Sequence, residues 1–364
     1  MINQFVKEKL EGLKLDECWD VHTHLLGDGA SDSGIYIKES KGIESAKDLI
    51  RIKLFKHYTN SVNAPTDYSY RNHMARCAEN AFDGFKALAF AFTGFHDEHG
   101  FENREASDFI IPNAWAKKAS EYSKSLLYVA SIHPLSETAL QELECAKKDG
   151  ALAIKWLPCA QNINPSNKRL ISFYDKMSQL KLPLITHAGA EKAVNGALFD
   201  QSYGNPLHLR LPLECGVKVI IAHCASSGCD IDFENRDKKI ESFELFSRLM
   251  NEKEYDGLIY GDISAIPQVN RCKWLPFLIE NKDWHHKLLN GSDYPLPAIP
   301  VLFSLRWLNI NGLISEKDVW NLQKLKKQNP LLFDFVLKRC LNHKGQKLSD
   351  EIFETKRVFD YHGE

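Results

Sequence analysis

Short apolar runs recur along the chain and alternate with longer amphipathic segments. Eight such runs are found, at about residues 18–21, 85–92, 126–132, 151–157, 182–186, 217–222, 257–263 and 287–292. Their apolar character is continuous rather than alternating, which is typical of strands buried on both faces of a parallel sheet. The pattern therefore predicts eight short parallel strands.

The segments between the runs carry helix signals. Segment 136–150 starts at Ser136, a residue type that caps helix N-termini, and ends at Gly150. Segment 167–181 places its apolar residues on one stripe of a helix. Strands alternating with helices predict an α/β fold, specifically a (β/α)8 TIM barrel. An open, doubly wound sheet is the alternative, and it fits less well because no GxGxxG motif follows the first run.

The spacing of the runs bears on domain organisation. The gap between the first and second runs is the longest, and residues of about 28–83 are predicted to form a lid-like insertion at the C-terminal face of the barrel. The barrel core is expected over about 18–312, with terminal helices packed outside it over about 313–364. One domain, residues 1–364, accounts for the chain.

Composition narrows the function classes. The 364 residues are 44% hydrophobic, and the net charge is −2 with both signs interspersed, so neither nucleic acid nor an anionic membrane is an expected partner. The N-terminus lacks the apolar region of a signal peptide, and no apolar run approaches the roughly 20 residues that span a bilayer. Nine scattered cysteines without a CxxC pair favour a reducing compartment. We therefore expect a cytoplasmic protein.

Side chains able to bind a metal ion lie in or just after five of the runs. They are His22 and His24 after the first run, Lys155 in the fourth, His187 after the fifth, His223 after the sixth and Asp293 after the eighth. His22 and His24 are two residues apart, so on a strand both point to the same face. In a barrel, all strands end on one rim. The remaining runs carry Lys86, His133 and Asp262, which suggest a role less directly.

Each of these residues has an ordinary structural explanation when taken singly. A histidine at a strand end is usually hydrogen-bonded or at the surface, Asp293 in GSDYP suits a turn, and a lysine in an apolar run can extend its amine to water. As a set, they match the imidazole and carboxylate ligands that Zn²⁺ prefers. Such an ion can lower the pKa of bound water to about 7. Asp293 is then the expected proton acceptor and donor.

The same residues, in this order, resemble the amidohydrolase superfamily. The phrases similar to its amidohydrolase 2 branch, which comprises predicted metal-dependent TIM-barrel hydrolases, are YVASIHP, GALAIKWLP, LPLITHAG, VIIAHCASSG and NGSDYPLP. The resemblance runs from about residue 18 to 300. It implies a metal-dependent hydrolase that attacks an amide, ester, lactone or related bond of a small molecule. It also admits a metal-dependent, non-oxidative decarboxylase of an aromatic or dienoic acid as an alternative.

The resemblance leaves the number of ions open. In binuclear members a lysine carboxylated by CO₂ bridges two ions, and Lys155 with His187 and His223 fits that pattern. In mononuclear members one ion takes the first-strand histidines, His187 and Asp293, while His223 acts on water. The implied cofactor is one or two divalent ions, most simply Zn²⁺, with a carbamate on Lys155 in the binuclear case. A homo-oligomer is implied by resemblance alone.

Two other classes of protein fit the sequence less well. A serine hydrolase is disfavoured, because no GxSxG motif accompanies Ser226 and Ser227. A binding protein with a structural metal would not need the complete ligand set. Candidates for substrate contacts follow the strand ends, and these are Arg71, His73, His96, His99, His133, Trp156, Lys168 and Arg169. Among them, the loop with His96 and His99 is expected to be solvated.

Overall fold

The computed structural model describes residues 2–38, 66–191, 198–235, 238–299 and 301–361. Two parallel sheets form its centre. The first holds β1 (Trp19–His24), β3 (Lys86–Phe90) and β5 (Leu126–Val129). The second holds β6 (Ile154–Trp156), β7 (Leu184–Thr186), β8 (Val219–Ile221), β11 (Ile259–Asp262) and β12 (Leu288–Leu289). Each of these strands lies in or overlaps a predicted apolar run.

Parallel bridges join the two sheets on both sides. On one side, Ala130 after β5 bridges to Ile154 of β6. On the other, Thr23 of β1 bridges to Tyr294 after β12, and the Val21 amide donates to the Asn290 carbonyl at 3.0 Å. The strands therefore close into a parallel barrel, and the predicted (β/α)8 fold is confirmed.

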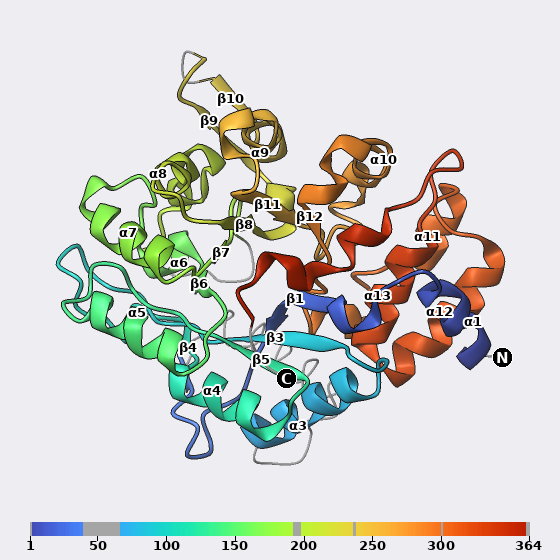
Figure 1. Ribbon diagram of the computed structural model, residues 1–364, viewed down its shortest axis with the longest axis horizontal. Coiled ribbons are helices and arrows are strands. Elements are labelled where there is room, and N and C mark those ends of the chain that lie inside the picture. Colours follow the sequence, from blue (N-terminus) through green and yellow to red (C-terminus); the bar gives the residue numbers. More distant parts are fainter. Residues whose placement is uncertain (1, 39–65, 192–197, 236–237, 300, 362–364) are drawn as a thin grey trace, which may run out of the picture.

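Helices surround the strands (Figure 1). Those that follow barrel strands are α3 (Thr66–Glu79), α4 (Asn113–Tyr122), α5 (Ala139–Lys148), α7 (Ile171–Gln179), α8 (Arg210–Glu214), α9 (Ser242–Asn251), α10 (Leu275–Glu280) and α11 (Leu305–Ile310). The predicted helical segments 136–150 and 167–181 correspond to α5 and α7. On α7, Phe173, Tyr174 and Met177 are buried, as the apolar stripe requires.

Further helices lie at one side of the barrel. They are α1 (Ile2–Leu10), α12 (Glu316–Gln328) and α13 (Pro330–Cys340), which pack on one another (Figure 1). A short helix, α6 (Pro158–Gln161), follows β6. Across the described residues, no helix combines the length and apolar composition needed to cross a membrane. All nine cysteines carry free thiols.

The core has two layers, which explains the continuous apolar runs. Inside the barrel, residues such as Val21, Leu88, Val129 and Ile220 pack together. The alternate positions of the same strands face the surrounding helices and belong to a larger cluster. Because both faces of each strand are buried, nearly every position is apolar.

Antiparallel pairs lie outside the barrel. Strand β2 (Tyr36–Ile37), in the predicted insertion, pairs with β4 (Phe109–Ile110). Residues 39–65 of that insertion lie outside the described residues, and helix α3 occupies its later part. A hairpin of β9 (Cys229–Asp232) and β10 (Lys238–Glu241) follows β8. The sequence did not predict this hairpin, because its strands are largely polar and exposed.

Candidate metal centre

The two histidines of β1 converge, as their spacing predicts. The Nε2 atoms of His22 and His24 lie 3.2 Å apart. His22 is buried, whereas His24 at the strand end is about one-third exposed. A Cβ at position 291 would lie 2.8 Å from the His22 Cβ, so Gly291 allows the chain after β12 to approach this histidine closely. The pair lies at the C-terminal end of β1. The end of the barrel at which its strands terminate is called the open end below.

Asp293 joins these two histidines. Its amide donates to the His22 carbonyl at 2.8 Å, and its φ of 61° bends the chain directly after the strand end. The Oδ1 atom lies 3.1 Å from His24 Nε2 and 3.8 Å from His22 Nε2. Ligand atoms that share one zinc ion lie roughly 3 to 3.5 Å from each other. These three donors are thus spaced closely enough to hold one divalent cation.

Asp262 orients His22 from the other side of the ring. Its Oδ2 atom lies 2.8 Å from His22 Nδ1, and both side chains are fully buried. With the proton held on Nδ1, the Nε2 lone pair is free to bind a cation. The sequence placed Asp262 at the end of the seventh run without a clear role. A hydrogen-bonding carboxylate behind a metal-ligand histidine is a tertiary feature, so spacing along the chain does not reveal it.

His223 lies in a tight turn after β8. His223, Cys224 and Ala225 all adopt positive φ, at 54°, 51° and 47°, in a region that residues other than glycine rarely occupy. The turn is stabilised by the Asp262 carboxylate, which accepts from the His223 amide at 3.0 Å. This conformation turns His223 Nε2 to within 3.7 Å of Asp293 Oδ2.

Ser264 holds the other nitrogen of His223. Its carbonyl lies 3.1 Å and its hydroxyl 2.8 Å from His223 Nδ1. Donation from Nδ1 to the Ser264 carbonyl leaves Nε2 as an acceptor on the side of Asp293. His223 is therefore placed to take a proton or to act as a further ligand.

His187 lies at the edge of this group, after β7. Its ring centroid is 5.6 Å from that of His223, and its Nε2 atom lies 3.4 Å from a Glu191 carboxylate oxygen. Among the described residues, the buried Nδ1 atom of His187 has no hydrogen-bond partner. An unpartnered nitrogen in a buried imidazole is costly, and a bound ion or water would satisfy it.

Lys155 is buried on β6. Its Nζ atom lies 5.0 Å from the Phe90 ring, which also packs on His22. Burial lowers the pKa of Lys155 to about 8. A neutral amine, which CO₂ addition requires, is therefore accessible near neutral pH.

The donor set fits a divalent cation. Burial, together with the charge of Lys155, holds the pKa of His22 well below its usual range. Burial also lowers the pKa of His223, with the charge of Arg271 acting in the same direction. Neutral imidazoles are the form that binds metal, and Asp293 supplies a carboxylate. His22, His24 and Asp293 would be the first ligands, with His223 and His187 nearby.

The residues that the sequence offers as candidates for substrate contacts lie in different surroundings. Arg71 is buried and stacks on Tyr122, with the guanidinium carbon 4.0 Å from the ring centroid, so it is structural. His73 is hydrogen-bonded to the Tyr294 hydroxyl at 2.8 Å. The loop with His96 and His99 was expected to be solvated, and His99 is indeed exposed. For His96 this expectation was wrong, because its ring is buried and stacks on His133 at a centroid distance of 4.1 Å.

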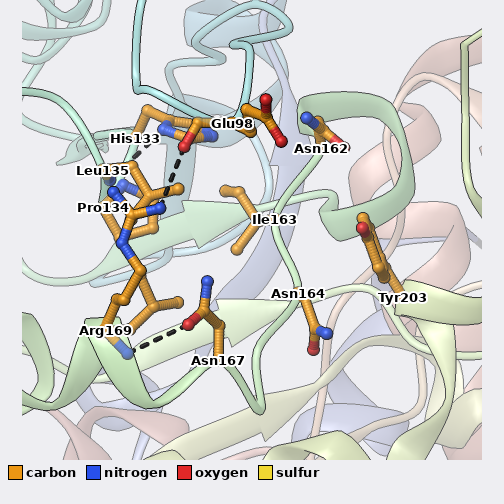
Figure 2. A pocket seen from close by; sticks show the side chains of 11 residues that line it. Glu98, His133, Pro134, Leu135, Asn162, Ile163, Asn164, Asn167, Arg169 and Tyr203 are labelled. Atoms are coloured by element: carbon orange, nitrogen blue, oxygen red, sulfur yellow. Dashed lines mark hydrogen bonds between the residues drawn. The ribbon is translucent and has the colours of Figure 1, made fainter.

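A shallow cavity of about 230 Å³ lies beside the ends of β5 and β6. Figure 2 shows His133, Asn162, Arg169 and Tyr203 around it. Arg169 reaches across and donates to the Glu98 carbonyl at 3.1 Å. This cavity is polar and lies on the face of the barrel where the strands end.

Comparisons with known proteins return solved structures alone. No protein-family model matches the chain, and no curated protein does. An uncharacterised TIM-barrel protein from Bordetella bronchiseptica has 14% identity and a TM-score of 0.49, with 85% of this chain and 100% of that chain covered. A Lactobacillus casei protein described as a metal-dependent hydrolase has 15% identity and a TM-score of 0.45, with 94% and 93% covered.

A 2,6-dihydroxybenzoate decarboxylase from Rhizobium is also similar, at 11% identity and a TM-score of 0.42, with 85% of this chain and 98% of that chain covered. Each activity belongs to the protein so described. The barrel of the present chain is established by its own strand pairing.

Proposed function

We propose that the chain is a metal-dependent hydrolase of a small molecule, with the candidate metal centre as its active site. The observation that carries the proposal is the convergence of His22 Nε2, His24 Nε2 and Asp293 Oδ1, with separations of 3.1 to 3.8 Å, at the open end of the barrel. Zinc suits two imidazoles and a carboxylate. A cytoplasmic location remains part of the proposal.

The side chains divide the chemistry between them. A divalent ion, when bound, would polarise the bond to be cleaved and activate water for attack. Asp262 keeps the proton of His22 on Nδ1. Asp293, whose pKa is raised by burial, would accept a proton from the attacking water and return it to the leaving group. His223 Nε2, 3.7 Å from that carboxylate, would orient the water or share the proton.

The number of ions depends on Lys155, His187 and His223. With a carboxylated Lys155, the two histidines would complete a second site. With a free Lys155 amine, one ion would suffice and His223 would be a catalytic base. The lowered pKa of Lys155, about 8, supports the carbamate, because it raises the fraction of reactive amine.

Non-oxidative decarboxylation of an aromatic or dienoic acid is the second candidate. The support for this reaction is the buried Lys155. Its charge contributes to the lowered pKa values of both His22 and His187. A substrate carboxylate beside Lys155 would neutralise that charge. The same ligands serve both reactions. Release of CO₂ distinguishes the decarboxylase from the hydrolase.

Elemental analysis tests the metal centre. We expect at least one zinc ion per chain in protein expressed with zinc and bicarbonate, and its loss in His22→Ala. Two ions would support a carboxylated Lys155, and amides, lactones and phosphoesters would be screened first. If one ion is found, carboxylic acids would be screened first, with release of CO₂ as the readout. A folded wild-type chain that binds no ion would contradict the proposal.

Asp293→Asn tests the proton transfer. The variant should fold like the wild type and lose most turnover, by about a hundredfold or more, since an amide cannot accept the proton. Wild-type turnover in the purified variant would show that Asp293 does not have this role. Bound metal without activity on any substrate panel would favour a binding protein.

A further inference from the structure

We infer that Arg271 binds an anionic oxygen group of the substrate, a carboxylate or a phosphate, beside the candidate metal centre. The inference rests on the proposed function, because it names the substrate class of the same site. The sequence did not single out Arg271, which lies outside the predicted strands and their immediate ends. Its position follows from the tertiary structure alone.

The backbone that carries Arg271 is held at the open end of the barrel. After β11 ends at Asp262, the chain turns at Ala265, which has a φ of 55°. The Gln268 amide donates to the Ala265 carbonyl at 3.0 Å, and the Arg271 amide to the Gln268 carbonyl at 2.9 Å. The Val269 amide also donates, at 3.1 Å, to the Leu302 carbonyl. These bonds fix where the side chain starts.

The guanidinium is anchored next to His223. Its Nη1 atom donates to the Ser226 hydroxyl at 3.0 Å. Ser226 is buried, and its own amide donates to the His223 carbonyl at 3.0 Å. The cation of Arg271 is thus held against the tight turn that aims His223 at Asp293.

The charge of Arg271 also acts on groups of the candidate metal centre. The charge of Arg271 is one cause of the lowered pKa values of His187 and His223. Burial lowers the pKa of Arg271, while the carboxylates of Asp293 and Glu191 act in the opposite direction.

Arg271 differs in its partners from the three arginines that form ion pairs in the described part of the chain. Arg210 and Arg248 each form two ion pairs with carboxylates, and Arg339 pairs with Asp350. For Arg271, the described part of the chain provides a serine hydroxyl and no carboxylate in ion-pair contact. A half-buried cation without a contacting anion is costly, so a bound anion is the natural partner.

The geometry of a guanidinium suits such an anion. With Nη1 occupied by Ser226, further N–H groups of the planar fork remain for two parallel hydrogen bonds to a carboxylate or phosphate. A divalent ion would neutralise the site carboxylates and leave the charge of Arg271 less compensated. The substrate would then be held by its anionic group at Arg271 while its reactive bond faces His223 and Asp293.

Isothermal titration tests the assignment. The experiment compares wild type, Arg271→Gln and Lys273→Gln, each in metal-free and in zinc-loaded form. Each protein is titrated with malonate, inorganic phosphate and the uncharged malonamide. Lys273 is exposed, two residues away, and paired with Glu241. We expect wild type to bind malonate or phosphate but not malonamide. In both protein forms, Arg271→Gln should weaken anion binding about tenfold or more, and Lys273→Gln should not.

Equal anion affinity in wild type and Arg271→Gln would overturn the assignment, as would binding of malonamide as tightly as malonate or no anion binding by wild type. A preference for malonate would point to a carboxylate substrate, and a preference for phosphate to a phosphoester. If Arg271→Gln does not fold, Arg271→Lys decides, because it keeps the charge and should bind more weakly than wild type. Absence of metal would refute the proposed function, whereas the metal-free titration would still judge Arg271.

Discussion

The histidines of this chain show how far a residue's surroundings decide its chemistry. His22 and His133 both follow or end an apolar run, and both are buried. His22 has a carboxylate at Nδ1 and other donor atoms near Nε2. His133 Nε2 instead donates to the Gln161 carbonyl at 3.1 Å, and its Nδ1 accepts from the Leu135 amide at 3.4 Å. The first arrangement suits a metal ligand, and the second suits a neutral structural residue.

His133 should make the protein acid-sensitive. Burial, and next the charge of His96, lowers the pKa of His133 to about 3. In the unfolded chain the pKa is about 6.5, so between pH 6.5 and 3 the unfolded state binds a proton that the folded state does not. Stability therefore falls as the pH falls through this window. Between pH 7 and 5 the loss due to His133 is about 2 kcal/mol.

Denaturant unfolding at pH 7 and 5 measures this effect. In His133→Gln, which keeps a side-chain amide to replace the hydrogen bonds, the loss of stability between the two pH values should be about 2 kcal/mol smaller than in wild type. His99→Gln, at an exposed histidine, is the matched control and should behave as wild type. An unchanged pH dependence in His133→Gln would refute the assignment.

At the scale of elements, helix α13 supports the strand end that carries Asp293. Lys338 and Asp334 lie four residues apart on this helix, a spacing typical of an exposed ion pair. Both side chains are instead fully buried, with Lys338 Nζ 2.5 Å from Asp334 Oδ2. Lys338 Nζ also donates to the Gly291 carbonyl, two residues before Asp293. The helix therefore braces the loop after β12 from outside the barrel.

Breaking this pair should be costly. Lys338→Met leaves the carboxylate of Asp334 buried without its partner, and we expect it to lower the free energy of unfolding by about 3 to 5 kcal/mol. The double variant Lys338→Met/Asp334→Leu removes both charges and should recover most of that loss. Urea unfolding of the three proteins provides the measurement. Equal destabilisation in single and double variants would mean that packing, not charge, dominates there.

At the scale of the whole molecule, the two ends of the barrel have different tasks. The open end holds the candidate metal centre. At the other end, the C-terminal segment covers the barrel interior, where Trp19 at the start of β1 stacks on Phe359 at a centroid distance of 6.0 Å. Thr355 accepts from the Trp19 amide and donates to its carbonyl. Strand β1 separates Trp19 from His24 by roughly 16 Å.

Stability and metal binding should therefore be separable. Phe359→Ala creates a cavity below Trp19 and should lower the free energy of unfolding by about 3 kcal/mol, while zinc content stays at the wild-type level. Phe101→Ala removes a ring that is 67% exposed and should cost less than about 0.5 kcal/mol. Chemical denaturation and elemental analysis of the same samples test both statements. Loss of zinc in folded Phe359→Ala would show that the two ends are coupled.

The sequence by itself determined the barrel and part of the candidate site. Strands buried on both faces must be apolar along their whole length, so the runs were visible without a structure. The HxH spacing likewise brings His22 and His24 together through local strand geometry. Asp293 could be placed on the same rim because parallel strands in a barrel all end at one face.

The tertiary structure alone decided the rest. Asp262 and Arg271 gain their roles from His22 and Ser226, which lie far from them in the sequence. The buried pair of Lys338 and Asp334 has the spacing of a surface pair. Local periodicity reports which side of an element is buried, whereas the partner of a polar group is set by contacts between distant segments. Those contacts exist only once the barrel has closed.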